Sequence, residues 1–324
     1  MTKNTTIATH HGSFHADDVF GVGVLMGVFP LHTLVRTRDQ ALIAAADFVV
    51  DVGGIWDAQA GRFDHHQRGF DGARPPRQVD GQSVPGVGYA SAGLVWSAHG
   101  AAYVQAWADA QGHGLDENAV QDVVRSVDHS LVQYLDIVDT GQGDVSPGIF
   151  GLSSLLAQLN THWMEEQGLS SETKARLQET RFCEAIAITR KFLDHAISKK
   201  VAQIRSVETV RQAPRLLGGR VLYLAEGGMP WTNVVVHEMP DVVFVIYPDS
   251  DGNQYQLKTV PVEAGSFTSR KDLPNSWSGL RDQELAAVTG VPDSVFCHLN
   301  LFIGGARSLD GAVRMAELAL ADPG

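Results

Sequence analysis

Three short strand-like segments near the start of the chain each end at a histidine or an aspartate, namely His10, Asp51 and Asp64. Helix-like segments over residues 17–28 and 41–46 lie between the first and the second of them. Short strands that alternate with helices are typical of βαβ units and a parallel sheet. Because ligands collect outside the carboxyl ends of the strands in an open parallel sheet, the pattern predicts that the three polar residues converge there.

Further histidines and aspartates lie in the same first fifth of the chain. A single histidine is more often a surface or core residue than a metal ligand, but a group of this size favours a metal site. Carboxylates mixed with imidazoles suit manganese, magnesium, iron or zinc, and the lack of nearby thiols disfavours a structural zinc site. Two ions about 3.5–4 Å apart can hold both oxygens of a phosphoryl displacement, which predicts a metal-dependent phosphoesterase. The candidates are His10, His15, Asp17, Asp51, Asp64, His65 and His66.

Positions at the predicted strand ends suggest a role for each of three catalytic candidates. Asp51 is placed to bridge two ions, although it could also be a helix N-cap or a turn residue beside Gly53. We expect Asp64 to orient a histidine through a hydrogen bond rather than to bind an ion itself. His66 would then face the substrate phosphate as an acid or as an electrostatic partner.

One further ligand candidate comes from a distant segment. Asp139 follows an apolar run and precedes Thr140-Gly141, so it could bind metal or belong to the last turn of a helix. Asp18 and His11 are adjacent to ligand candidates, and we expect both side chains to point away from the site.

Composition narrows the class of protein. A chain of 324 residues suggests two domains, and a formal net charge of −12 disfavours a protein that coats nucleic acid through bulk electrostatics. Cys183 and Cys297 lie far apart and cannot form a disulfide framework, which fits a cytoplasmic location. We expect no signal peptide and no membrane span, because no apolar run is long enough.

Patterns further along the chain predict its organisation. Residues 71–88 hold three prolines and four glycines, which predicts a loop that borders the active site or forms a lid over it. Helical spacing of apolar residues predicts one long helix over 116–137 and a longer one over about 170–204 that links two domains. Closely spaced strands then predict a smaller α+β domain with a partly antiparallel sheet. The predicted domains are 1–207 and 208–324.

The motifs together resemble the DHH phosphoesterase superfamily, which includes single-strand exonucleases, oligonucleotide and cyclic-dinucleotide phosphodiesterases and manganese-dependent pyrophosphatases. The chain is most similar to one branch, the melanocyte-proliferating-gene family, through segments that include Asp64–His66, Gly265–Lys271 and Gly279–Asp282. The resemblance implies an α/β fold, with a DHH-type parallel sheet flanked by helices over 1–207. It also implies a C-terminal α+β domain like the DHH-associated one, which binds substrate, over 208–324.

The resemblance implies a function as well. It suggests two divalent ions, most plausibly manganese, and a 3′–5′ exonuclease that acts on single-stranded RNA or short oligonucleotides. The glycine-rich segment Phe302–Gly305 would approach phosphate closely, unless its glycines form a strand-to-helix turn. Basic side chains of the second domain would anchor phosphates, unless they form a solvated charged face. The substrate candidates are Gly304, Gly305, Arg307, His298, Arg270, Lys271 and Arg281.

Two other functions remain open from the sequence. A small-molecule phosphatase or a (cyclic) dinucleotide phosphodiesterase would use the same chemistry in a narrower cleft. A non-catalytic scaffold would bind metal without turnover. The sequence shows no run of interleaved aromatic and basic residues on which nucleic acid could stack, and it leaves the oligomeric state undecided, with a homodimer possible.

Overall fold

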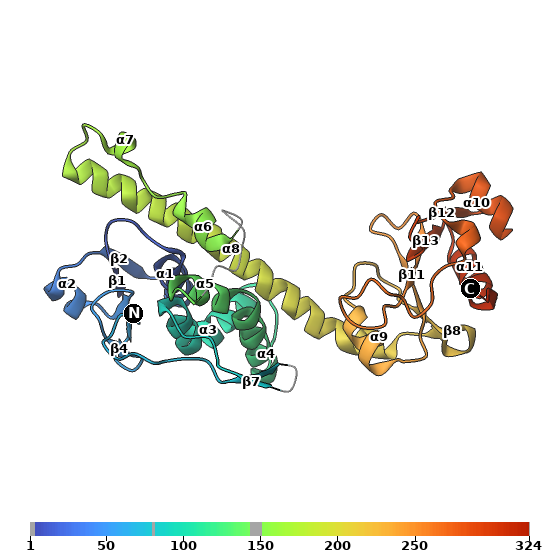
Figure 1. Cartoon of the computed structure of the whole chain (residues 1–324), viewed down its shortest axis with the longest axis horizontal. Coiled ribbons are helices and arrows are strands. Elements are labelled where there is room, and N and C mark those ends of the chain that lie inside the picture. The colour runs from blue at the N-terminus through green and yellow to red at the C-terminus, as the bar shows by residue number, and fades with distance from the viewer. Residues whose placement is uncertain (1–3, 80–81, 143–150, 324) are drawn as a thin grey trace. The chain divides into compact units, whose positions relative to one another are not determined.

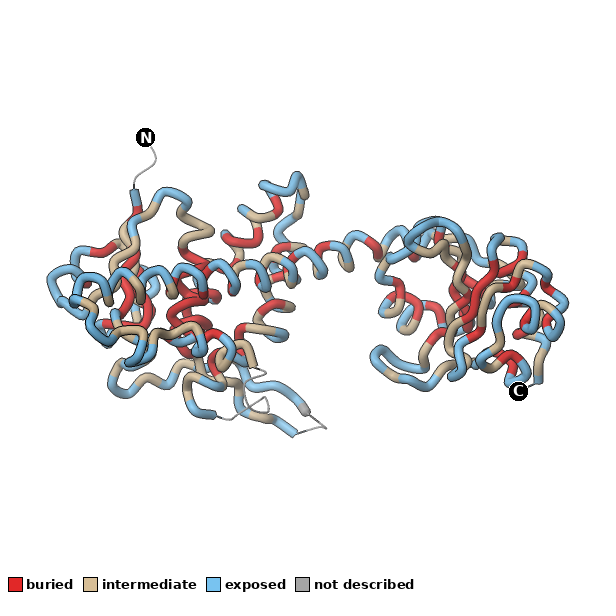
Figure 2. Tube along the Cα trace, turned by 90° about the horizontal axis from the view of Figure 1, so that it is seen from above, coloured by how far each residue is buried: buried red, intermediate tan, exposed pale blue. Residues whose placement is uncertain are grey.

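The computed structural model describes residues 4–79, 82–142 and 151–323 (Figure 1). The chain divides into two compact units, Met1–Lys200 and Val201–Gly324. The 42-residue helix α8 (Ser171–Gln212) contributes residues to both units. Buried residues concentrate inside each unit separately, and each unit therefore has its own core (Figure 2).

The N-terminal unit is built on a five-stranded sheet with the order β2-β1-β3-β5-β4. The first four of these strands are parallel neighbours, and the short β4 pairs antiparallel with β5. This confirms the predicted parallel sheet with flanking helices. The strands are β1 (Thr5–Thr9), β2 (His32–Arg36), β3 (Phe48–Val50), β4 (Trp56–Asp57) and β5 (Arg62–Phe63).

Helices α1 (Ala16–Val28) and α3 (Ser91–Ala110) pack against each other and against the sheet. Helix α1 is apolar on nearly every side, as expected of a helix that is buried all round. A side chain at Gly21 would come within 2.8 Å of Val50 Cγ1, so glycine allows α1 to lie close to β3. This contact fixes the first turn of α1 beside the carboxyl end of β3. Helix α2 (Gln40–Ala45) packs against β1.

Two local predictions in this unit need correction. The predicted helix over 116–137 is interrupted, because a π-helical turn (Asp128–Val132) separates α4 (Glu117–Val127) from α5 (Gln133–Asp139). The predicted loop over 71–88 contains an antiparallel pair, β6 (Arg77–Val79) and β7 (Gln82–Val84), and residues 80–81 lie outside the described part. Local spacing gave no signal for either feature. The remaining helices are α6 (Leu152–Ala157) and α7 (Trp163–Glu166).

The C-terminal unit is built on a six-stranded mixed sheet with the order β12-β13-β11-β10-β9-β8. Only β9 and β10 are parallel neighbours in it, and the other pairs are antiparallel. Its strands are β8 (Arg215–Leu216), β9 (Val221–Tyr223), β10 (Phe244–Pro248), β11 (Tyr255–Thr259), β12 (Ser294–Cys297) and β13 (Ile303–Ala306).

Strand alternation divides the core of this unit into two layers. Phe244 and Ile246 of β10 belong to the cluster that contains α10 (Asp282–Thr289) and α11 (Leu309–Ala321). Val245 points to the opposite cluster, which contains α9 (Thr232–Glu238). Short 3₁₀ turns occur at Leu217–Gly219 and Asn275–Trp277.

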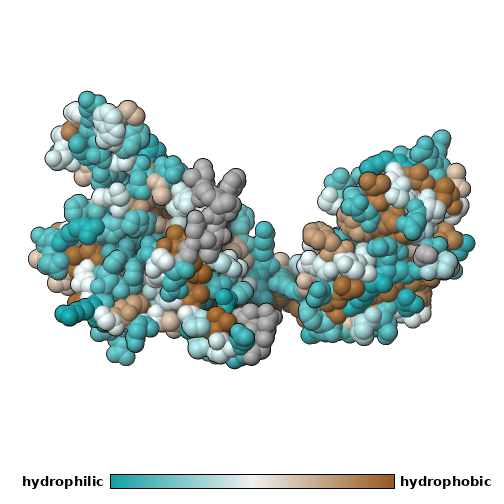
Figure 3. All heavy atoms as spheres, in the orientation of Figure 1, coloured by the Kyte–Doolittle hydropathy of each residue, from teal (hydrophilic) through white to brown (hydrophobic). Residues whose placement is uncertain are grey.

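The surface is mostly hydrophilic on the face of the molecule drawn in Figure 3, with apolar residues in scattered patches. Within the described ranges, no helix is both long and apolar enough to cross a lipid bilayer.

Candidate metal centre

The predicted metal ligands come together at the carboxyl edge of the N-terminal sheet. His10 follows β1, Asp51 follows β3, and His65 lies just beyond β5. Each of these three neighbouring parallel strands therefore places one candidate ligand at the edge. Asp17 comes from the first turn of α1 and Asp139 from the end of α5. Ligand atoms lie within 4.8 Å of one another in three groups: His10, His15 and Asp51; Asp17, His65 and Asp139; and Asp51, Asp64, His65 and His66.

Asp51 occupies the middle of this arrangement. Its Oδ2 lies 3.4 Å from His10 Nε2, whereas its Oδ1 lies 3.8 Å from His65 Nδ1. The backbone of Asp51 is left-handed, with φ of 54°, a conformation that aspartate tolerates better than most residues. The two oxygens therefore face two different groups of ligands, as a bridging carboxylate requires.

Asp17 is held by the start of helix α3. Its Oδ1 accepts a hydrogen bond from the backbone N–H of Ala92 at 2.6 Å, and its Oδ2 accepts one from that of Ser91 at 3.1 Å. Free N–H groups in the first turn of a helix favour an anion. The orientation of Asp17 thus depends on a helix that begins more than seventy residues later.

His65 is held by the side chains of Asp139 and Ser91. Its Nε2 lies 3.3 Å from Asp139 Oδ2, and its Nδ1 lies 3.1 Å from the hydroxyl oxygen of Ser91. That hydroxyl also donates to Asp51 Oδ1 at 3.2 Å. The sequence did not single out Ser91 as a site residue, because its role depends on the contact between β5 and α3.

Asp64 and His66 lie at the edge of the group, where His66 Nδ1 also lies 3.3 Å from Asp51 Oδ1. Asp64 Oδ1 lies 2.9 Å from His66 Nδ1 and also accepts from the backbone N–H of His66. Asp64 Oδ2 accepts from the backbone N–H of Gly54 at 2.6 Å. Asp64 is therefore buried and engaged in supporting bonds, while His66 is largely exposed.

Asp18 was expected to point away from the site, and this expectation was wrong. Its Oδ2 lies 3.3 Å from His10 Nε2, and its Oδ1 accepts from the backbone N–H of His15. The second contact is one half of a capping box at the start of α1, a spacing that could have signalled it. His11, in contrast, is exposed.

Burial and charge shift the titration of these groups. Burial raises the pKa of Asp17 well above its usual value, and the charges of Asp51 and Asp139 raise it further. Burial also raises the pKa of Asp18 to about 7, although His10 opposes the shift. Burial alone would raise the pKa of Asp51, but His10 and His66 hold it below its usual value. The contact with Asp51 is the main reason why the pKa of His66 rises to about 9.

The donor set fits divalent cations. Several buried carboxylates repel one another here, and a cation would neutralise that charge. Oδ2 of Asp18 is buried and accepts no hydrogen bond from any residue in the described ranges. Imidazole and carboxylate donors without thiolates suit manganese, magnesium, iron or zinc.

Comparison with known proteins gives the family. The profile of a family described as "Uncharacterised protein family (UPF0160)", with the label MYG1, matches residues 6–320. The chain belongs to the MYG1 family. This confirms the family that the motifs predicted.

Members of the MYG1 family match the chain over nearly its whole length. The "MYG1 protein C27H6.8" of Caenorhabditis elegans is 31% identical, over 97% of this chain and 94% of the relative. The human "MYG1 exonuclease" is also 31% identical, over 97% of this chain and 85% of the relative. A structure of RecJ from Thermus thermophilus with Mg²⁺ aligns with 99% of this chain and 50% of that one, at 13% identity and a TM-score of 0.27, too low to bear on the fold.

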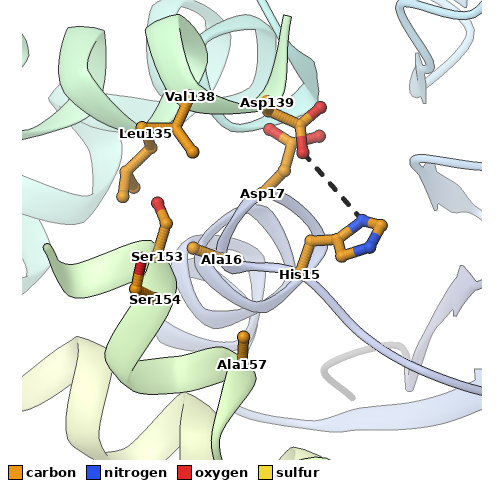
Figure 4. A pocket seen from close by; sticks show the side chains of 9 residues that line it. All are labelled: His15, Ala16, Asp17, Leu135, Val138, Asp139, Ser153, Ser154 and Ala157. Carbon is orange, nitrogen blue, oxygen red and sulfur yellow. Dashed lines mark ion pairs between the residues drawn. The ribbon is translucent and has the colours of Figure 1, made fainter. Parts of the chain in front are cut away.

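Two cavities border the candidate metal centre of this MYG1-family chain. One, of about 350 Å³, lies between His15, Asp17 and Asp139 on one side and Leu135, Val138 and the hydroxyls of Ser153 and Ser154 on the other (Figure 4). The second, of about 530 Å³, is lined by His65, His66 and Asp139 and by residues of the 71–88 segment. The 71–88 segment therefore borders the candidate site.

A buried ion pair fixes the 71–88 segment. The guanidinium of Arg74 donates to Asp136 at 2.7 Å and to Asp128, on the π-helical turn, at 2.6 Å. Asp136 Oδ1 also accepts from the backbone N–H of Gly93. The wall of the second cavity is thus anchored to the same helices that position Asp17 and Asp139.

Arg36, at the end of β2, holds the loop that carries His10. Its Nη2 donates to the carbonyl of Gly12 at 2.7 Å, and its Nε donates to that of His10 at 3.2 Å. The guanidinium lies 4.4 Å from the centre of the Phe182 ring on α8. A planar fork of donors that also stacks on an aromatic ring is a property of arginine that lysine lacks.

We expect Arg36→Lys to weaken Mn²⁺ binding by about 10- to 100-fold, the usual effect of losing a group that orients a ligand. The charge remains, but the two carbonyls of the His10 loop lose their common donor. Titration of activity and of bound Mn²⁺ against metal concentration would measure the shift. Arg38→Lys, at an exposed neighbouring position, is the control, and an unchanged metal dependence in Arg36→Lys would contradict the assignment.

Several substrate candidates of the C-terminal unit have structural roles. Arg270 donates to the carbonyls of Met239, Val242 and Val236, at distances of 2.7 to 2.8 Å, and so closes the end of α9. Lys271 Nζ donates to the carbonyl of Asp322 at 2.8 Å. These contacts give Arg270 and Lys271 structural roles, and the predicted phosphate contacts of the two residues stay predictions.

Gly304 and Gly305 lie inside strand β13, not in a strand-to-helix turn. Their backbones pair with both β11 and β12, and a Cβ on Gly305 would come within 2.9 Å of the carbonyl oxygen of Tyr255. Close strand packing therefore accounts for these glycines.

Arg281, Arg307 and His298 are exposed and stay available. Nη2 of Arg307 lies 3.7 Å from Oδ1 of Asp282, and the centres of the His298 and Phe302 rings are 4.5 Å apart.

Proposed function

We propose that this chain is a metal-dependent 3′–5′ exonuclease that acts on single-stranded RNA or short oligonucleotides. Membership of the MYG1 family makes it a hydrolase of phosphodiester bonds, and its human relative carries the name exonuclease. The observation that carries the proposal is the position of Asp51, whose two oxygens face two separate groups of ligands.

The proposal includes a DHH-type arrangement of functions. The N-terminal domain, 1–207, would hold the metal ions, and the C-terminal domain, 208–324, would bind substrate. A parallel sheet with ligands at its carboxyl edge supports the first assignment. Exposed Arg281, Arg307 and His298 support the second, since arginine suits phosphate recognition.

Two Mn²⁺ ions would share Asp51. His10 and His15 would complete one ligand set, and Asp17, His65 and Asp139 would complete the other. When bound, two such ions supply hydroxide at neutral pH and neutralise charge on the phosphoryl group. Ser91 and Arg36 would keep the ligands in place through the contacts already described.

His66 would act on the substrate phosphate. Its side chain is 63% exposed, and in the metal-free chain the contacts with Asp51 and Asp64 raise its pKa to about 9. Asp64 fixes the ring through Nδ1. A protonated imidazole held in this way could donate a hydrogen bond to a phosphoryl oxygen or a proton to the departing oxygen.

The cavities favour a second candidate function, a (cyclic) dinucleotide phosphodiesterase or a small-molecule phosphatase. Volumes of about 350 and 530 Å³ fall in the range of small-ligand sites. The net charge of −12 makes long duplex nucleic acid the least suitable substrate.

Metal-stripped protein should be given Mn²⁺ and then a 5′-labelled single-stranded RNA, the same RNA with a blocked 3′ end, a dinucleotide and pyrophosphate. We expect stepwise shortening of the first RNA only, because attack begins at a free 3′ end. Cleavage of the dinucleotide or pyrophosphate without shortening of the RNA would support the second function instead. Bound metal without turnover of any substrate would contradict both functions and favour a scaffold.

A further inference from the structure

The C-terminal unit contains a cavity of about 460 Å³ that none of the roles above uses. Three aromatic residues from separate segments line it: Trp231 before α9, Phe267 in the segment after β11, and Phe302 before β13. Lys258 of β11, Thr232 and Asn300 supply polar groups to the same cavity. The aromatic platform that the sequence did not reveal is assembled here by the tertiary structure.

Phe267 is the most unusual of these residues. Its side chain is fully exposed, at 105% of the reference area, whereas Trp231 is buried, at 6%. Single exposed apolar residues are common on protein surfaces. An exposed ring at the mouth of a cavity that already contains two aromatic residues is instead placed to cover a flat ligand.

Three polar side chains of the cavity are free to bind a ligand. Lys258 forms no ion pair with any residue that the structure describes. The side-chain amide of Asn300 and the hydroxyl of Thr232 have no hydrogen-bond partner in the same ranges. Aromatic faces, hydrogen-bonding groups and one cation match a nucleobase and the phosphate next to it.

We propose that this cavity binds one base of the single-stranded substrate, with Phe267 stacked on the base and Lys258 close to the neighbouring phosphate. This inference rests on the proposed function and names the part of the substrate that the C-terminal unit recognises. Stacking on an aromatic ring accepts any base, so the site would favour unpaired strands without reading their sequence.

Binding can be tested separately from catalysis. The Asp51→Asn variant of the full chain would be titrated with a fluorescein-labelled single-stranded RNA and with an abasic strand of the same length, and anisotropy would give Kd for each. Adding Phe267→Ala should raise Kd for RNA by about 10-fold, which is in the range of one lost stacking contact. Kd for the abasic strand should change by less than about twofold, because that strand has no base to stack.

Matched variants complete the test. Val288→Ala removes another exposed apolar side chain of this unit, and Arg314→Ala removes an exposed cation on α11. Lys258→Ala should raise Kd for both strands, whereas the two control variants should change Kd for neither strand. Phe267→Trp should retain RNA binding, because it keeps an aromatic face.

The outcomes separate this inference from the proposed function. If Asp51→Asn binds RNA with the same Kd whether or not it also carries Phe267→Ala, the base site is overturned. The base site is also overturned if Phe267→Ala weakens binding of RNA and of the abasic strand by the same factor. Hydrolysis of bis(4-nitrophenyl) phosphate by the wild-type chain, and its loss in Asp51→Asn, would report on the metal centre alone. A base site without this hydrolysis would therefore contradict only the proposed function.

Discussion

Replacing Asp51 by asparagine should lower hydrolysis by at least about 1,000-fold, or about 4 kcal/mol of transition-state stabilisation. The amide removes the negative charge that His10 and His65 share with Asp51, and one of its two donor atoms can no longer face an ion. Asparagine tolerates the left-handed backbone of this position, where φ is 54°, so the fold should survive. Rates with RNA at saturating Mn²⁺ would measure the loss.

Asp57→Asn is the matched control, because Asp57 is exposed on β4 of the same sheet and belongs to none of the ligand groups. We expect that variant to hydrolyse RNA at the wild-type rate. Circular dichroism of Asp51→Asn should match the wild-type spectrum. Full activity in Asp51→Asn would remove the bridging assignment and the proposed function with it.

The metal-free chain should become more stable as the pH falls from 8 to 5.5. The pKa of Asp18 is raised from 3.8 to about 7 in the folded chain, so the folded state binds a proton that the unfolded state releases. The contribution of Asp18 to the free energy of unfolding is complete below its pKa in the unfolded chain. It is lost as the pH rises through its pKa in the folded chain. Between pH 7 and 5.5, Asp18 alone would contribute about 2 kcal/mol.

Neighbouring groups act in the same direction. The pKa values of Asp17, His10 and His66 are also raised, so their protonation likewise favours the folded state. The pKa of Asp51 is lowered, but that contribution is lost only in more acidic solution. Thermal melts of the chelator-treated chain and of Asp18→Asn should therefore differ, with a flatter pH dependence in the variant.

Added Mn²⁺ should reverse this trend. Its ligands must be deprotonated, so the ion stabilises the chain most at pH 8 and least at pH 5.5. At 100 times Kd the gain would be about 2.7 kcal/mol, or a rise in Tm of roughly 5–10 °C. A melting temperature that changes neither with pH nor with added Mn²⁺ would contradict a buried carboxylate site that binds cations.

Short-range patterns predicted much of the N-terminal unit. Alternation of strand-like and helical segments predicted the parallel sheet, and the strand ends predicted that His10, Asp51 and Asp64 would converge. In the structure His10 and Asp64 each share a ligand group with Asp51. The predicted supporting bond from Asp64 to a histidine corresponds to the observed contact with His66. These features follow from local rules, since a strand end fixes the place of the residue beyond it.

Other features depend on contacts between distant segments. The π-helical turn at Asp128–Val132 and the pair of strands within 71–88 follow no local spacing. Arg270 resembled a phosphate anchor in sequence, but its guanidinium is within hydrogen-bonding distance of the carbonyls at the end of α9. Donor type is visible in a sequence, whereas the oxygen that a donor reaches is decided by packing.

The sequence by itself determined the family, the parallel sheet and the chemical type of the candidate metal ligands. Tertiary structure decided that Ser91 and α3 orient Asp17 and His65, that Asp18 faces His10, and that three distant aromatic residues line one cavity. The physical reason is one of range. Strand and helix patterns arise from neighbours in the chain, but a hydrogen bond or a stacked ring across many residues exists only after the core has packed.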